Sequence, residues 1–183
     1  MQLPKMPSFS LKGRTALVVG ASSGIGTACA VALAEYGAKV TLAARRKDKL
    51  EILAHQMKKK EFEVKIIQLD INDITKTSDT ICKQETFDIL VNSAGIAKHS
   101  SSVDTLFNDF DVVMHTNLRG AYFLTQAVAK KLISESKKGS LINISSQMGL
   151  VGGQERAVYC ASKHAVEGFT KAMAIEFGNH NIR

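Results

Sequence analysis

Short apolar runs alternate with longer amphipathic stretches along this chain of 183 residues, starting near residue 14. The apolar runs predict β-strands at residues 15–19, 39–43, 63–69, 89–92 and 140–144. The amphipathic stretches between them predict helices at residues 24–36, 47–60, 74–83, 104–135 and 158–177. Strand and helix therefore follow each other in regular order.

Several of the predicted strands are apolar without interruption, such as Ala16-Leu-Val-Val19 and Asp88-Ile-Leu-Val91. Uninterrupted apolar strands suit a sheet that is covered on both faces, and alternating strands and helices form βαβ units with a parallel sheet. No repeat, linker or low-complexity segment divides the sequence. We therefore predict an α/β fold, with a single domain spanning residues 1–183.

A glycine-rich turn, Gly20-Ala-Ser-Ser-Gly24-Ile-Gly26, joins the first predicted strand to the first predicted helix. Glycines allow a tight turn that approaches a pyrophosphate closely, and the helix N-terminus favours its negative charge. The position of the turn is typical of a Rossmann-type dinucleotide fold. We expect Gly20, Ser22, Ser23, Gly24, Ile25 and Gly26 to contact a dinucleotide, although the turn could also be purely structural.

Two arginines, Arg45 and Arg46, follow the second predicted strand. A fold that binds NAD usually has an acidic residue there for the ribose 2′-hydroxyl, whereas arginine suits the 2′-phosphate of NADP. The sequence therefore favours NADP as the cofactor, with NAD as the less favoured choice. The alternative is that both arginines face solvent without a ligand.

The ends of the third and fourth predicted strands carry further candidates for cofactor binding. Asp70, followed by Ile71, could accept a hydrogen bond from an adenine amino group, or it could order the loop before the next helix. The segment Asn92-Ser-Ala-Gly95 ends the fourth strand, where small residues such as Ala94 would let the backbone approach the adenosine ribose. A tight turn would explain Gly95 but accounts less well for Asn92.

A candidate catalytic group lies near the end of the sequence. Tyr159 and Lys163 are four residues apart on the last predicted helix and therefore share one face. A lysine ammonium beside a phenol favours the phenolate, so that Tyr159 could donate and accept a proton. Ser146 ends the fifth strand, where its hydroxyl could meet a substrate carbonyl. Individually, the helical pair could be a surface pair and Ser146 a loop cap.

Composition and charge exclude several other functions. Hydrophobic residues make up 45% of the chain and charged residues 22%, which is typical of a globular protein. The net charge is +7, but its lysines occur in short runs and aromatic residues are only 6%, which argues against nucleic-acid binding. The three cysteines are far apart and suggest neither a metal site nor a disulfide framework. With no long apolar run and no secretory signal, we expect no membrane segment and a cytoplasmic location.

Taken together, these segments resemble the short-chain dehydrogenase/reductase family from about residue 11 to the last residue. The resemblance implies that Tyr159 is the general acid/base and that Ser146 holds the substrate carbonyl. It also implies that Lys163 binds the nicotinamide ribose and assists Tyr159, while Asn117 holds a water that links Lys163 to solvent. Like Tyr159 and Lys163, Asn117 would then belong to an NADP-dependent site that interconverts a carbonyl and a secondary alcohol.

The same resemblance implies partners for the chain. The two long helices would pack across a homodimer or homotetramer interface, and the substrate would be a small carbonyl or alcohol. Sugar or polyol dehydrogenases and 3-oxoacyl carrier-protein reductases are the substrate classes that the family suggests.

The sequence departs from the family pattern at three places. Val19 stands where many members carry threonine, and Ser93 stands in place of a more usual asparagine. After Gly178 only five residues follow, so we expect a shortened sheet that lacks the last strands and leaves residues 140–144 at an exposed edge. Two functions therefore remain: an active oxidoreductase, or a truncated cofactor-binding remnant or interaction module with little turnover.

Overall fold

A computed structural model describes residues 7–183 and contains one parallel sheet of five strands in the order β3-β2-β1-β4-β5. The strands are β1 (Thr15–Val19), β2 (Lys39–Ala44), β3 (Val64–Gln68), β4 (Ile89–Asn92) and β5 (Ser140–Asn143). Every neighbouring pair is parallel, as the alternation of strands and helices predicts. Because β1 lies between β2 and β4, the strand order reverses next to β1, where dinucleotides bind in such sheets.

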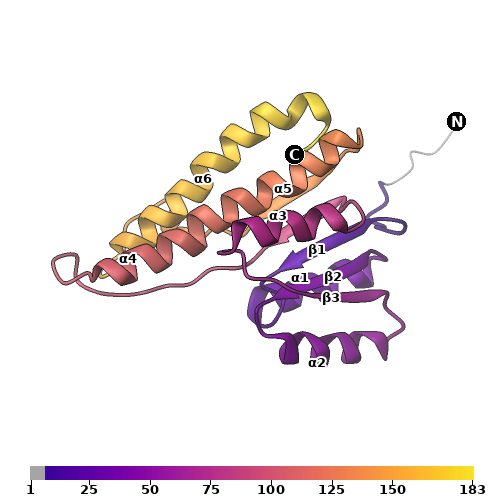
Figure 1. Cartoon of the computed structure of the whole chain (residues 1–183), viewed down its shortest axis with the longest axis horizontal. Helices are drawn as coiled ribbons and strands as arrows, with labels where there is room; N and C mark the ends of the chain where they lie inside the picture. The colour runs from indigo at the N-terminus through magenta and orange to yellow at the C-terminus, as the bar shows by residue number, and fades with distance from the viewer. Residues whose placement is uncertain (1–6) are drawn as a thin grey trace, which may run out of the picture.

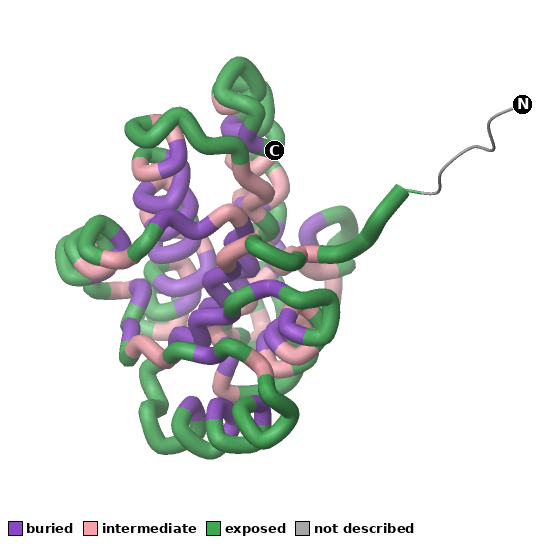
Figure 2. The backbone as a smooth tube through the Cα atoms, turned by 90° about the vertical axis from the view of Figure 1, so that its right-hand side faces the viewer, coloured by how far each residue is buried: buried purple, intermediate pink, exposed green. Residues whose placement is uncertain are grey.

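Helices cover both faces of the sheet, as Figure 1 shows. α1 (Gly24–Glu35) and α2 (Lys47–Lys58) pack on the face that carries Ala16 and Val18 of β1. α3 (Ile74–Lys83) and α5 (Ala121–Ser134) pack on the opposite face, against Leu17 and Val19. Alternate side chains of β1 therefore enter two apolar cores, and the buried segments run through the centre of the molecule in Figure 2. The α/β, Rossmann-type fold with helices on both faces is confirmed.

The single helix predicted over residues 104–135 differs in detail. It begins at Phe107 and consists of α4 (Phe107–Met114), a π-helical turn at His115–Gly120, and α5. The long helix α6 (Ala157–Phe177) lies alongside it (Figure 1). Short 3₁₀ turns at Gln147–Gly149 and Gly178–His180 complete the list of helical segments in the part of the chain that the structure describes.

β5 lies at one edge of the sheet, as expected, but the start of this strand has a partner. Ile182 forms a parallel bridge with Gly139, and the amide of Leu141 donates to the carbonyl of Arg183 at 2.7 Å. Ile182 is only 2% exposed because it joins the apolar core on the α5 face. Residues 182 and 183 thus pair with the chain at the start of β5, and the rest of β5 lies at the edge of the sheet.

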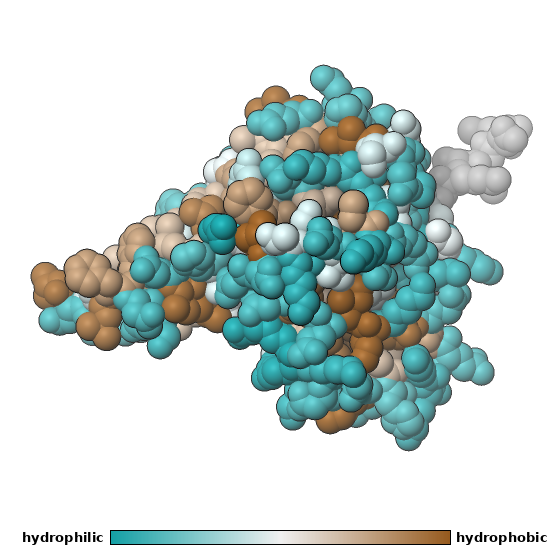
Figure 3. Space-filling view, viewed as in Figure 1, coloured by the Kyte–Doolittle hydropathy of each residue, from teal (hydrophilic) through white to brown (hydrophobic). Residues whose placement is uncertain are grey.

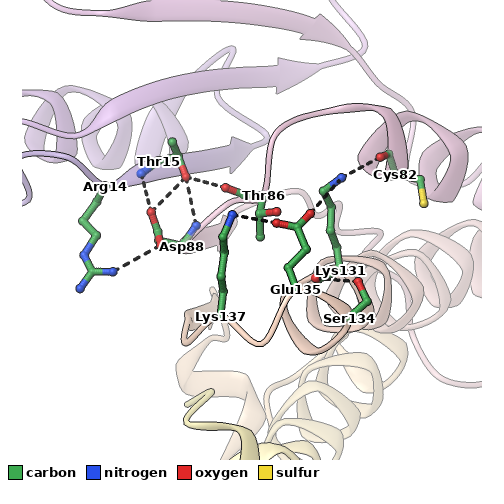
Figure 4. A network of polar contacts seen from close by, with 9 residues as sticks. All are labelled: Arg14, Thr15, Cys82, Thr86, Asp88, Lys131, Ser134, Glu135 and Lys137. Atoms are coloured by element: carbon green, nitrogen blue, oxygen red, sulfur yellow. Dashed lines mark hydrogen bonds and ion pairs between the residues drawn. The ribbon is translucent and has the colours of Figure 1, made fainter.

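A polar network fixes the end of the sheet that lies opposite the glycine-rich turn (Figure 4). The Asp88 carboxylate accepts hydrogen bonds from the amide of Thr15 at 2.9 Å and from Arg14 Nη1 at 3.3 Å. Glu135, at the end of α5, pairs with Lys137 at 2.7 Å and with Lys131 at 3.7 Å. The Asp88 contacts tie the starts of β1 and β4 together, and Lys131 ties α5 to α3 by donating to the carbonyl of Cys82 at 2.7 Å.

Candidate functional site

A cleft of about 540 Å³ opens at the carboxyl ends of β1, β2, β3 and β4. Most of the residues predicted to bind a cofactor line it: Gly20, Ser22, Ser23, Gly24, Ile25, Arg45, Arg46, Asp70, Ile71, Ala94 and Gly95. Gly26, Asn92, Tyr159 and Lys163 do not line this cleft. The fold therefore collects residues from four strand ends, because the carboxyl ends of parallel strands meet at one edge of the sheet.

The glycine-rich turn shapes one wall of the cleft. Gly20 adopts φ +81°, and a Cβ there would lie 2.7 Å from the amide nitrogen of Ala94, so only glycine fits. Gly26 packs directly against the Gly20 carbonyl, which explains why it supports the turn without facing the cleft. α1 then begins at Gly24 with neither a side-chain cap nor an acidic residue in its first turn. Its N-terminus is therefore suited to an anion.

Arg46 lies across this turn. Its Nη2 donates to the hydroxyls of Ser22 and Ser23 at 2.8 and 3.0 Å. The backbone carbonyl of Arg45 accepts a hydrogen bond from Gln68 at 3.0 Å, which holds the end of β2 against the end of β3. A cationic group and two hydroxyls thus share one corner of the cleft, a combination that suits a phosphate.

Asn72 and Thr116 line the cleft but were not predicted from the sequence. Asn72 Nδ2 donates to Thr116 Oγ1 at 3.2 Å, while Asn72 Oδ1 is buried and has no partner among the described residues. Asp70 uses one carboxylate oxygen to accept from the amide of Asn72 at 3.0 Å, so it orders its own turn as well as lining the cleft. Asn72 follows Asp70 closely in sequence, and this proximity was the signal that could have identified it.

Asn92 has a different environment from the glycines and serines of the cleft. Its side chain is 3% exposed, donates to Asn143 Oδ1 at 3.2 Å and accepts from the amide of Ala94 at 3.2 Å. Asn143 Oδ1 also accepts from Thr125 on α5. Asn92 therefore joins β4 to β5 and shapes the turn at Ala94, and it affects the cleft through that backbone.

The predicted catalytic residues come together on α6 and the segments beside it. Lys163 is 6% exposed; its Nζ donates to the carbonyl of Ile144 at 2.7 Å and lies 5.8 Å from the centre of the Tyr159 ring. Ser146 caps the 3₁₀ turn after β5 by accepting from the amide of Met148 at 3.1 Å. The carbonyl of Ile144, just after β5, thus fixes the Lys163 ammonium close to Tyr159.

Burial affects the charge of Lys163. Its ammonium lies in surroundings that exclude most water, and this desolvation lowers the pKa of Lys163 below the ordinary lysine value of 10.5. No carboxylate pairs with it among the salt bridges of residues 7–183. A desolvated cation without a counter-ion is the kind of group that an anion or a developing negative charge would stabilise.

Asn117 connects the cleft to this group through the π-helical turn. Its amide bonds to both the N–H and the C=O of Ile96 at 2.8 Å, and it donates to Ser162 Oγ on α6 at 3.1 Å. Ser162, which was not predicted, is fully buried beneath Tyr159, whose carbonyl accepts from its hydroxyl at 2.8 Å. The Asn117 side chain thus holds the loop after β4 against α6, and the water site that the family resemblance implies at Asn117 stays a prediction.

Gly95 lies between the cleft and the catalytic residues. A Cβ on Gly95 would be 3.4 Å from Asn117 Oδ1 and 3.8 Å from Lys163 Nζ. The cleft that begins at the glycine-rich turn therefore ends beside the Lys163 ammonium. A dinucleotide, which carries a pyrophosphate between two riboses, fits this sequence of groups.

Two further observations concern residues 7–183. That part of the chain contains no group of three or more histidine, cysteine, aspartate and glutamate side chains that could hold a metal ion. It also contains no helix that is long and apolar enough to cross a membrane.

The chain is similar to one known protein family and to several proteins of known sequence. Residues 14–183 match the short chain dehydrogenase family. The D-erythrulose reductase of Gallus gallus is 34% identical over 97% of this chain and 70% of its own length. The 3-oxoacyl-acyl-carrier-protein reductase of Rickettsia prowazekii (strain Madrid E) is 36% identical over 95% and 70%.

A solved structure from Agrobacterium tumefaciens, assigned as a 2-deoxy-D-gluconate 3-dehydrogenase and containing bound NADP, superposes with a TM-score of 0.88. It is 40% identical, and the match covers 97% of this chain and 71% of that one. The chain thus spans about 70% of the length of these proteins.

Proposed function

The chain belongs to the short-chain dehydrogenase/reductase family, and from this premise we propose that it interconverts a carbonyl and a secondary alcohol with NADP. The observation that carries the proposal is the cleft that runs from Arg46 and the glycine-rich turn to Gly95, beside which Lys163 Nζ lies. Bound nicotinamide cofactor supplies or accepts the hydride. The residues of the chain bind that cofactor, orient the substrate and move the proton.

Each catalytic residue has a role that its position supports. Tyr159 is the proton donor in reduction and the acceptor in oxidation, because Lys163 Nζ stabilises negative charge near its ring. Ser146 offers a hydroxyl at the end of β5 for the substrate oxygen. Asn117 joins the loop after β4 to Ser162 on α6, and Lys163 joins α6 to Ile144 just after β5. These bonds keep the three segments together.

NADP is the preferred cofactor in this proposal, since a cationic Arg46 and the hydroxyls of Ser22 and Ser23 meet where a 2′-phosphate would lie. We expect the wild-type protein to bind NADPH more tightly than NADH. Arg46→Ala removes charge-assisted hydrogen bonds of about 1.5–3 kcal/mol, and should therefore weaken NADPH binding by roughly tenfold to a hundredfold. Binding of NADH should change much less, as measured by cofactor fluorescence titration.

Lys49→Ala is the matched control for the cofactor experiment, because Lys49 carries the same charge on exposed α2 and does not line the cleft. Its NADPH affinity should remain within about twofold of wild type. Tighter binding of NADH than of NADPH by the wild-type protein would contradict the assignment.

We also place a cytoplasmic location and a homo-oligomer in this proposal. The three cysteines are free, which suits a reducing compartment.

Apolar side chains gather where α4 begins, at the tapered end of the molecule in Figure 3, and Val103, Leu106 and Phe107 are each more than half exposed. An exposed apolar group of this kind favours contact with a second copy of the chain. Light scattering measures the oligomeric state, and a monomer would contradict the proposed homo-oligomer.

A further inference from the structure

A backbone hydrogen bond joins the two loops that flank Tyr159. The amide of Ser100, in the loop after β4, donates to the carbonyl of Glu155 at 3.1 Å, just before α6 begins. The hydroxyl of Ser100 lies 3.0 Å from that of Thr105, which closes the first loop on itself. Glu155 has φ +57°, an uncommon conformation for a residue other than glycine. Both loops are therefore held in place beside Tyr159, at some cost in backbone strain.

The loop that this hydrogen bond holds carries His99, which lies against Tyr159. The two rings meet edge to face, with centroids 6.4 Å apart and planes at 76°. His115 and His164 each use a ring nitrogen on a main-chain carbonyl one helical turn away. His99 is exposed, and among residues 7–183 neither of its ring nitrogens has a hydrogen-bond partner. An imidazole with both nitrogens available thus lies beside the residue proposed to move the proton.

We propose that His99 is a substrate-recognition residue that hydrogen bonds to a hydroxyl group next to the substrate carbonyl. The inference rests on the proposed function, because it places the substrate carbonyl at the Tyr159 hydroxyl. Groups on the adjoining carbon then come near the Tyr159 ring, against which the His99 ring lies with centroids 6.4 Å apart. A neutral imidazole both donates and accepts, which suits a hydroxyl. The substrate class is therefore a short hydroxylated ketone or the corresponding polyol.

The discriminating variant is His99→Phe, which retains a ring against Tyr159 but removes both nitrogens. Erythrulose and 2-butanone form a matched pair of ketones, since they share a four-carbon chain and differ only in hydroxyl groups. With NADPH, we expect His99→Phe to lower kcat/KM for erythrulose by about tenfold or more, as the loss of one substrate hydrogen bond would do. For 2-butanone, kcat/KM should stay within about twofold of wild type. 1-Hydroxy-2-butanone should lose as much as erythrulose if the adjoining hydroxyl is the group recognised.

Three outcomes would overturn the role of His99: equal losses for both ketones, no loss for either, or a wild-type preference for 2-butanone. Equal losses would show that the ring only positions Tyr159. A second readout separates this inference from the proposed function, namely the affinity of erythrulose for the NADP-saturated protein by calorimetry. If wild type binds erythrulose without turnover, the proposed function fails, and a tenfold weaker affinity in His99→Phe still supports recognition. Undetectable binding of erythrulose by wild type, or equal binding by both proteins, would refute the recognition role of His99.

Discussion

Lys163 carries a positive charge in surroundings that disfavour it. The side chain is 6% exposed, and its only hydrogen bond within residues 7–183 is to the carbonyl of Ile144. Desolvation lowers the pKa of Lys163 in the folded chain, whereas the unfolded chain keeps the ordinary value of 10.5. The unfolded state therefore binds more protons between these two values, and the free energy of unfolding contributed by this group rises with pH there.

The rise of this free energy with pH leads to a stability prediction for the protein without cofactor. Lys163→Met removes the titrating group but keeps an unbranched side chain of similar length. The free energy of unfolding of wild type minus that of Lys163→Met should increase as the pH rises from neutral toward 10.5. Urea denaturation at several pH values measures this difference, and Lys171→Met on the exposed side of α6 serves as the control. A difference that stays flat or falls with pH would contradict the desolvation of Lys163.

Residue type and strand position predict which side chains gather at the carboxyl ends of the strands, while their binding of a cofactor stays a prediction. Arg46 follows a strand end directly, and its contacts with Ser22 and Ser23 need only the turn between β1 and α1. The partners of Asn92 and Asn117 could not be predicted in the same way. Each amide bonds to a segment more than twenty residues away in the chain, and such pairs appear only after folding.

At the scale of elements, the long helix from α4 to α5 is the least regular part of the fold. The π-helical turn at His115–Gly120 interrupts it at the point where Asn117 meets the loop after β4 and α6. Such turns insert an extra residue in a helical turn and often occur at functional sites. The amphipathic pattern predicted one continuous helix because a single π turn changes the hydrophobic period too little to be recognised.

Asn117 therefore has a structural consequence that can be measured apart from turnover. Asn117→Ala leaves the N–H and C=O of Ile96 without their partner in a part-buried site. The free energy of unfolding should fall by at least about 2 kcal/mol, since unsatisfied buried groups cost about 1–3 kcal/mol each. Asn108→Ala, on the exposed surface of α4, should change it by less than about 0.5 kcal/mol. Equal stability of the two variants, measured by urea denaturation, would exclude this bracing role.

At the scale of the whole molecule, the sheet order and the two-layer covering follow from the alternation of strands and helices. Five strands, the glycine-rich turn and the location of the cleft at their carboxyl ends were predictable for that reason. The pairing of Ile182 with Gly139 was not, because two residues at the end of a chain carry no periodicity. The fastening of the loops beside Tyr159 was not predictable either, since it depends on one backbone hydrogen bond between distant segments.

We propose that Tyr159 transfers the proton in an NADP-dependent reaction, and removal of its hydroxyl oxygen tests this role. Tyr159→Phe should reduce NADPH-dependent ketone reduction by at least about a hundredfold, because positioned acid/base groups contribute roughly 10²–10⁴. NADPH affinity should remain within about threefold of wild type, since Tyr159 lies outside the cleft. Tyr122→Phe, a partly exposed tyrosine on α5, should leave both quantities unchanged. Near-native turnover by Tyr159→Phe would contradict the role of Tyr159 in proton transfer, and no turnover by the wild-type chain would contradict the proposed reaction.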